Sequence, residues 1–302
     1  MMESVEKPPV YRIIEGCLYA RERLPYAQDI RVHSLGHGHT EAVLLPRYGW
    51  TELGEVSPSA LVDASMCEGN IWVDGAWAPA PPLSQDELLR KAAHNIARSA
   101  RRAKTKVRRL CKARGLTTMM TLTYRENMGD RARMGRDFDV FVKRIRRVIP
   151  DFTYLCVFEQ QKRGAWHAHI AVPRVLSHYL KKGVLIKSFD LLRSMWRGVV
   201  GADNGNVDVS RRKRMGRSSA KLAAYMSKYI TKGFGDGSPQ GDSYRSSGRA
   251  LPPPVVVRVN TASLPEGIQA VVDLLEADMG PRVEFYQALL DCGGYFVSLS
   301  PR

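Results

Sequence analysis

The chain has 302 residues, of which 44% are hydrophobic, and it carries a net charge of +16. This hydrophobic content excludes a wholly disordered chain, and the length suffices for one large domain or two small ones. The positive charge favours a polyanionic partner. Nucleic acid is the leading candidate, although membrane surfaces also attract basic proteins.

Five cysteines are spread widely along the chain, and no two of them form a Cys-x-x-Cys pair. An odd number at wide spacing indicates free thiols in a reducing compartment rather than a disulfide framework or a zinc finger. No apolar run approaches the roughly 20 residues that cross a bilayer, and the charged start lacks the pattern of a secretory signal. We therefore expect a cytoplasmic protein with no membrane partner.

The first segment, residues 1–82, is mildly charged and interrupted by glycine and proline turns, which predicts short strands and loops. It contains His37-Gly38-His39, with Glu41 nearby. Two histidines at this spacing can bind a metal, but the flanking glycines favour a solvent-exposed loop. We treat the segment as an N-terminal extension of unknown role.

Residues 83–114 predict a long helix whose charge has one sign. Ser84 and Glu87 form a capping box at its start. Eleven lysines and arginines, and no acidic residue, lie between Arg90 and Arg114. Solvated helices normally mix both signs, so contacts with DNA phosphates explain this helix better. The candidate DNA-binding residues on it are Arg101, Arg102, Arg108 and Arg109.

The next segment, 115–235, predicts an α/β unit. Its expected strands lie at 117–124, 154–160, 166–172 and 206–210, and its expected helices lie around 138–149, 188–200 and 218–232. An arginine-rich stretch before the last helix suits a phosphate backbone, and its candidate DNA-binding residues are Arg211, Arg212, Lys213 and Arg214.

The remaining chain consists of two segments. Residues 236–254 are rich in glycine, serine and proline, which predicts a flexible linker. Residues 255–302 contain one expected strand at 255–259 and one expected helix around 268–277, and we treat them as a C-terminal extension of unknown role.

Two histidines in the segment WHAHI lie two residues apart on a predicted strand. Because strand side chains alternate faces, His167 and His169 point the same way. A short hairpin loop ending at Gly164 would pair Glu159 with His167 and so bring a carboxylate to the same face. These ligand types suit one Mg²⁺ or Mn²⁺ ion. The simpler alternative is a pair of ordinary histidines on a half-buried sheet.

Two tyrosines in the predicted helix 218–232 are four residues apart, so Tyr225 and Tyr229 share one helix face. Lys228 and Lys232 each follow a tyrosine by three positions. A phenol with a pKa near ~10 needs help to react, and a nearby ammonium favours the phenolate and stabilises charge on a phosphate. Attack on phosphorus would give a covalent phosphotyrosine. These four residues are the candidate catalytic set.

The simpler interpretation of this helix is that the tyrosines pack and the lysines are solvated. However, Leu222, Met226 and Ile230 already form an apolar stripe elsewhere on the helix, which indicates that burial does not require the tyrosines. The preceding arginine-rich stretch also points toward a phosphate backbone. Both features favour the catalytic interpretation.

Three ordered motifs resemble those of the HUH endonucleases: TLTY at 121–124, WHAHI at 166–170 and YMSKYITK at 225–232. Within these enzymes the chain is similar to the two-tyrosine rolling-circle replication initiators of single-stranded-DNA bacteriophages and related plasmids. The resemblance covers about residues 115–235. It matches His167 and His169 to the family's two histidines and Glu159 to its upstream ligand. Ala168 is smaller than the bulky residue usual at the middle position.

This resemblance implies an α/β (α+β) fold with a central antiparallel sheet flanked by helices, similar to an RNA-recognition motif. It also implies an enzyme of the bacterial host cytoplasm that nicks single-stranded DNA at a replication origin and stays attached to the 5′ end. A host polymerase would extend the released 3′-hydroxyl. Because the sequence has no Walker-type loop, unwinding would come from a host helicase.

Two other functions fit parts of the sequence. A relaxase or a single-strand transposase would use the same chemistry, but the former usually has three histidines and the latter one tyrosine. A non-catalytic, basic nucleic-acid-binding protein would show no metal dependence and form no covalent adduct.

Overall fold

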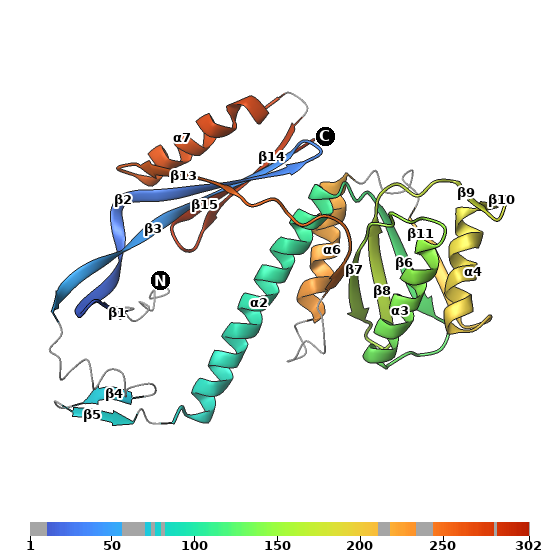
Figure 1. The fold of residues 1–302 in the computed structure, drawn as a ribbon, viewed down its shortest axis with the longest axis horizontal. Coiled ribbons are helices and arrows are strands. Elements are labelled where there is room, and N and C mark those ends of the chain that lie inside the picture. Colours follow the sequence, from blue (N-terminus) through green and yellow to red (C-terminus); the bar gives the residue numbers. More distant parts are fainter. Residues whose placement is uncertain are drawn as a thin grey trace.

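The computed structural model describes residues 11–55, 70–73, 76–79, 82–210, 218–233, 244–280 and 283–301. They form two antiparallel sheets that lie on either side of one long helix, α2 (Gln85–Ala113), as Figure 1 shows. The predicted α+β fold, with an antiparallel sheet flanked by helices, is confirmed. The capping box at Ser84 and Glu87 is also confirmed.

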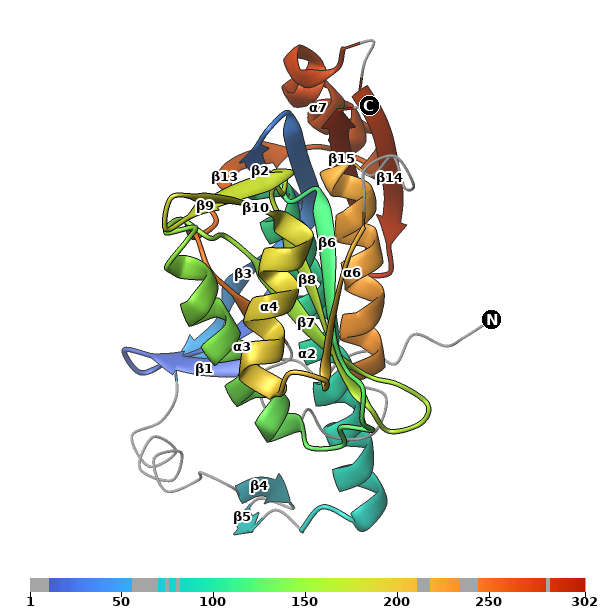
Figure 2. The same cartoon turned by 90° about the vertical axis from the view of Figure 1, so that its right-hand side faces the viewer.

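The first sheet is the core of the segment 115–235. Its neighbouring strands run in the order β11 (Gly205–Val209), β6 (Thr118–Tyr124), β8 (Trp166–Val172), β7 (Leu155–Gln160) and β12 (Tyr244–Ser246). Helices α3 (Arg131–Arg146) and α4 (Ser188–Val200) cover one face, while α2 and α6 (Ser219–Gly233) cover the other (Figure 2). The predicted strands and helices of this segment therefore all form.

Alternation along the strands creates two separate cores in this unit. Ala168 and Ile170 of β8 face α3 and α4, where Phe138 and Trp196 are fully buried. Ala171 lies on the opposite face, in the cluster that includes side chains of α2 and α6. Each large apolar side chain buried in this way contributes about 1.5–3 kcal/mol. The packing fixes which face of β8 meets α6.

The second sheet is built from both ends of the chain. A long hairpin of β2 (Cys17–Gly36) and β3 (His39–Glu55) lies at its centre, and α7 (Leu264–Leu275) packs against it. The other strands are β1 (Tyr11–Ile14), β13 (Val255–Asn260), β14 (Val283–Leu290) and β15 (Gly294–Pro301). Residues 1–82 and 255–302, which the sequence presents as separate extensions, thus share one sheet. The prediction of only short strands in 1–82 is wrong for β2 and β3.

Three shorter elements complete the described structure. Small hairpins form from β4 (Asn70–Val73) with β5 (Ala76–Pro79) and from β9 (His178–Lys181) with β10 (Val184–Lys187), and a 3-10 turn, η1, spans Glu276–Asp278. Within the predicted flexible linker, residues 236–243 lie outside the described residues. The linker prediction is corrected for Tyr244–Ser246, which pair with β7 as β12.

Two properties predicted from composition can be compared with the described residues. The cysteines there (Cys17, Cys111, Cys156 and Cys292) are free thiols, as predicted. Among the described helices, none is long and apolar enough to cross a membrane.

Candidate active site

The β7–β8 hairpin places the two histidines and the glutamate on one sheet face. Glu159 pairs with His167 and Val157 pairs with His169, so the predicted register is confirmed. Gly164 allows this register because it adopts a φ of 89°, which favours glycine. The predicted glycine-terminated turn therefore sets which side chains face α6.

The three candidate metal ligands are buried: Glu159 is 9%, His167 8% and His169 7% exposed. The Nε2 atom of His169 lies 2.8 Å from Oε2 of Glu159. The ring centroids of His167 and His169 are 6.4 Å apart. Among the described residues, no three His, Cys, Asp or Glu side chains are gathered as a metal site. Glu159 and His169 therefore form a contacting pair, and His167 stands apart from them.

His167 nevertheless fits a cation-binding role. Its Nε2 atom is buried and has no hydrogen-bond partner among the described residues. Burial lowers the pKa of His167, and the neighbouring His169 and Arg163 lower it further. The ring therefore stays neutral at neutral pH, as a metal ligand must. An unsatisfied buried polar atom costs about 1–3 kcal/mol, and a cation bound at this nitrogen would remove that cost.

Helix α6 brings the two tyrosines onto the histidine face. The ring of Tyr229 stacks on the ring of His169, with centroids 4.1 Å apart and planes inclined by 17°. The Tyr229 hydroxyl donates a hydrogen bond to the Tyr225 hydroxyl. The rings of Tyr225 and Tyr229 meet edge to face at 5.0 Å. Both phenol oxygens thus lie together, and Tyr229 directly contacts a candidate metal ligand.

Tyr229 also has a packing role that the sequence analysis did not predict. It is only 9% exposed and belongs to the core cluster that contains Leu222, Met226 and Ile230. The inference that burial does not require the tyrosines is therefore wrong for Tyr229. Tyr225 is half-buried and packs against the edge of the same cluster.

The remaining candidate catalytic and DNA-binding residues differ in position. Lys228 is exposed and lines a cleft beside α2. Arg101 and Arg102 are exposed on α2. The side chain of Lys232 lies outside the described residues, as do Arg211, Arg212, Lys213 and Arg214.

Two polar side chains that the sequence analysis missed hold the histidines. Thr121 Oγ1 lies 3.3 Å from Nδ1 of His169, and Gln161 Nε2 lies 3.2 Å from Nδ1 of His167. Such contacts fix the ring orientation and the tautomer of metal-binding histidines. Thr121 pairs with His169 across β6 and β8. A strand alignment that included β6 would therefore have identified it.

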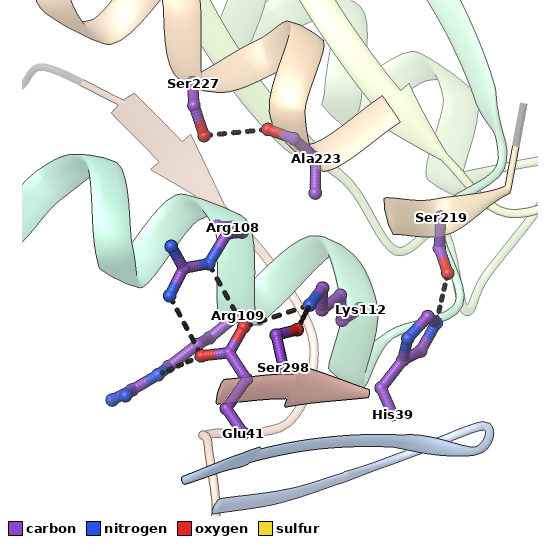
Figure 3. A network of polar contacts seen from close by, with 9 residues as sticks. All are labelled: His39, Glu41, Arg108, Arg109, Lys112, Ser219, Ala223, Ser227 and Ser298. Carbon is purple, nitrogen blue, oxygen red and sulfur yellow. Dashed lines mark hydrogen bonds and ion pairs between the residues drawn. The ribbon is translucent and has the colours of Figure 1, made fainter. Parts of the chain in front are cut away.

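A buried carboxylate explains part of the one-sign charge of α2. Glu41 of β3 is fully buried and accepts hydrogen bonds from Arg108, Arg109 and Lys112 at 2.9–3.1 Å (Figure 3). Lys112 also donates to Ser298 of β15, at 2.8 Å. Burial would raise the pKa of Glu41, but the three cations outweigh burial and lower it to about 2. Arg108 and Arg109 thus have a counterion within the chain, and phosphate contacts are not needed to explain them.

His39 makes a second contact between the two units. Its Nε2 atom lies 2.6 Å from Oγ of Ser219, at the start of α6 (Figure 3). His39 is 2% exposed, so the prediction of a solvent-exposed loop is wrong for this residue, although His37 is exposed at the hairpin turn. Burial and the charge of Lys112 lower the pKa of His39 to about 4. This contact ties the tip of the β2–β3 hairpin to the tyrosine helix.

Comparison with known proteins gives one match. Residues 117–234 match a family model of replication-associated proteins, the one that carries the designation ORF2. The matched region spans β6 to the end of α6 and so contains both the histidine strand and the tyrosine helix. The match supports a replication initiation protein. Searches of curated proteins and of solved structures gave no significant match.

Proposed function

We propose that this chain is a metal-dependent DNA-nicking and DNA-joining enzyme that starts rolling-circle replication. Its chemistry would be that of an HUH endonuclease with two tyrosines. The observation that carries the proposal is the stacking of Tyr229 on His169, with the hydroxyls of Tyr225 and Tyr229 hydrogen-bonded to one another. A nucleophile pair and a set of candidate metal ligands are thereby adjacent on one sheet face.

The proposed reaction is a transesterification. The phenol oxygen of Tyr225 or Tyr229 attacks a backbone phosphorus of single-stranded DNA, and the bond from phosphorus to the 3′-oxygen breaks. The phenol proton leaves, and the departing 3′-oxygen takes up a proton, so the products are a 5′-phosphotyrosine and a free 3′-hydroxyl. Because one phosphoester replaces another, a 3′-hydroxyl can reverse the step and join the strand.

The residues suited to hold Mg²⁺ or Mn²⁺ are Glu159, His167 and His169. When bound, such an ion makes the phosphorus more electrophilic and orients the phosphate. Thr121 and Gln161 would keep the histidine rings in their binding orientation. The cationic side chains of Lys228 and Lys232 would stabilise negative charge near the tyrosines.

The proposed substrate is single-stranded DNA at a replication origin. Arg101 and Arg102, which are exposed on α2, are suited to contact its phosphates. The stretch from Arg211 to Arg214 would serve the same purpose beside α6. A host helicase would supply unwinding, and a host polymerase would extend the 3′-hydroxyl.

Replacing His167 with alanine tests the metal assignment. The variant should lose metal-dependent cleavage of single-stranded DNA and bind Mn²⁺ more weakly, because one ligand is gone, while DNA affinity changes little. The matched control is His178→Ala, since His178 is an exposed histidine of β9. Cleavage is measured on denaturing gels and Mn²⁺ binding by titration calorimetry. Unchanged cleavage and Mn²⁺ affinity in His167→Ala would remove His167 from the site.

A further inference from the structure

A cleft of about 810 Å³ lies between the two units, and the proposed reaction does not use most of it. Its walls come from α2, α6 and the β14–β15 hairpin. Figures 1 and 2 both place this hairpin beside α2 and α6. One wall of the cleft is thus the helix that carries the two tyrosines. The opposite wall belongs to the C-terminal segment, for which the sequence indicates no role.

Aromatic rings form the wall on the β14–β15 side. Phe285, Tyr286 and Phe296 line the cleft. Tyr286 is 63% and Phe285 47% exposed, so both present large apolar surfaces to solvent. Tyr286 meets Phe296 edge to face at 6.1 Å, and the Arg108 guanidinium lies 4.9 Å from the Phe296 ring. Exposed apolar surface rimmed by polar groups is typical of interaction sites.

Cations form the helical walls. The exposed lysines Lys104 of α2 and Lys221 and Lys228 of α6 line the cleft, and the described acidic residue in its lining is Glu284. Arg108 and Lys112 also reach it, although both contact Glu41. The lining is therefore strongly basic as well as aromatic. A polyanion with flat, apolar faces matches both properties.

We infer that this cleft binds single-stranded DNA next to the site of cleavage, with bases stacked on the aromatic wall and phosphates on the lysine wall. Aromatic rings facing a basic groove are the usual means of holding an unpaired strand. Bases within a duplex already stack on one another and cannot offer their faces to Tyr286. The inference builds on the proposed function, because it assigns part of that enzyme's substrate to a second surface.

Tyr286→Ala and Lys221→Ala test this inference. Both changes are made in the Tyr225→Phe/Tyr229→Phe background without divalent metal, so that cleavage cannot affect the measurement. The probe is fluorescent oligothymidylate of about 16 nucleotides, within the site sizes of single-strand-binding folds. Tyr26→Ala is the matched tyrosine control, because Tyr26 is 65% exposed outside the cleft. Lys143→Ala, an exposed lysine of α3, is the matched lysine control.

Tyr286→Ala should raise the dissociation constant about tenfold, as expected for the loss of one stacked base. Lys221→Ala should reduce the log–log salt slope by about 0.7. The control variants should match the background protein, and Tyr286→Trp should restore affinity. If Tyr286→Ala unfolds, Tyr286→Leu keeps apolar bulk without an aromatic ring and should show the same loss of affinity.

Equal affinity in Tyr286→Ala, Tyr26→Ala and the background protein would overturn the inference. Equal effects on single-stranded and duplex probes would also overturn it, because stacking requires unpaired bases. This outcome is separable from failure of the proposed function. A chain that forms a covalent adduct but shows no effect of the cleft variants refutes only the cleft. A chain that forms no adduct, yet loses affinity in Tyr286→Ala, refutes only the nicking activity.

Discussion

Tyr225→Phe/Tyr229→Phe should abolish the covalent DNA adduct completely, because phenylalanine lacks the attacking oxygen. The affinity for single-stranded DNA should change little, since both rings and their packing on His169 and on each other are retained. The adduct is measured on a denaturing gel and the affinity by fluorescence anisotropy. Tyr48→Phe, a change at an exposed tyrosine of β3, is the control.

The single variants separate the roles of the two tyrosines. Each should still form an adduct on an oligonucleotide, at unequal rates, because the hydroxyls are adjacent and one metal site can serve either. Each should release few closed circles, since the first tyrosine stays blocked by its phosphate until the second one acts. If one single variant loses all cleavage and the other releases circles normally, only one tyrosine is catalytic.

Glu41→Gln should destabilise the protein by about 3 kcal/mol, because it leaves Arg108, Arg109 and Lys112 clustered without their buried counterion. The free energy of unfolding is measured by urea titration. Glu55→Gln changes an exposed glutamate of the same strand and should have little effect. Equal stability of the two variants would show that the Glu41 network does not hold the second sheet to α2.

The pH dependence of this difference is also fixed in sign. The pKa of Glu41 is about 2 in the folded protein, against an ordinary value of 4.5. Its contribution to stability is therefore complete above about pH 4.5 and is lost as the pH falls toward 2. The difference in unfolding free energy between the wild type and Glu41→Gln should shrink over that range. A constant difference would contradict the assignment of the low pKa to Glu41.

Local signals account for the parts of the fold that the sequence predicts correctly. The capping box marks the start of α2, and alternation on β8 gives the common face of His167 and His169. Gly164 marks the turn that aligns Glu159 with the histidines. Each of these signals operates over a few residues, and each is chemically specific.

Long-range pairing accounts for what the sequence does not reveal. Val257 of β13 pairs with Ile30 of β2, and Ser298 of β15 pairs with Glu41 of β3. No local pattern links segments so distant in the chain. The polar residues and register shifts of β2 also interrupt the alternation that would predict a long strand. For the same reason, Glu41 could not be recognised as a counterion of Arg108, 67 residues away.

The most direct test of the central claim is incubation of the wild-type protein with 3′-labelled, random-sequence single-stranded DNA and Mn²⁺, followed by a denaturing gel and mass spectrometry of the adduct. We predict a slowly migrating covalent band that requires the metal, with a 5′-phosphate linked to the peptide that contains Tyr225 and Tyr229. A band that forms equally in EDTA, an adduct on another residue, or cleavage without any adduct would contradict this account.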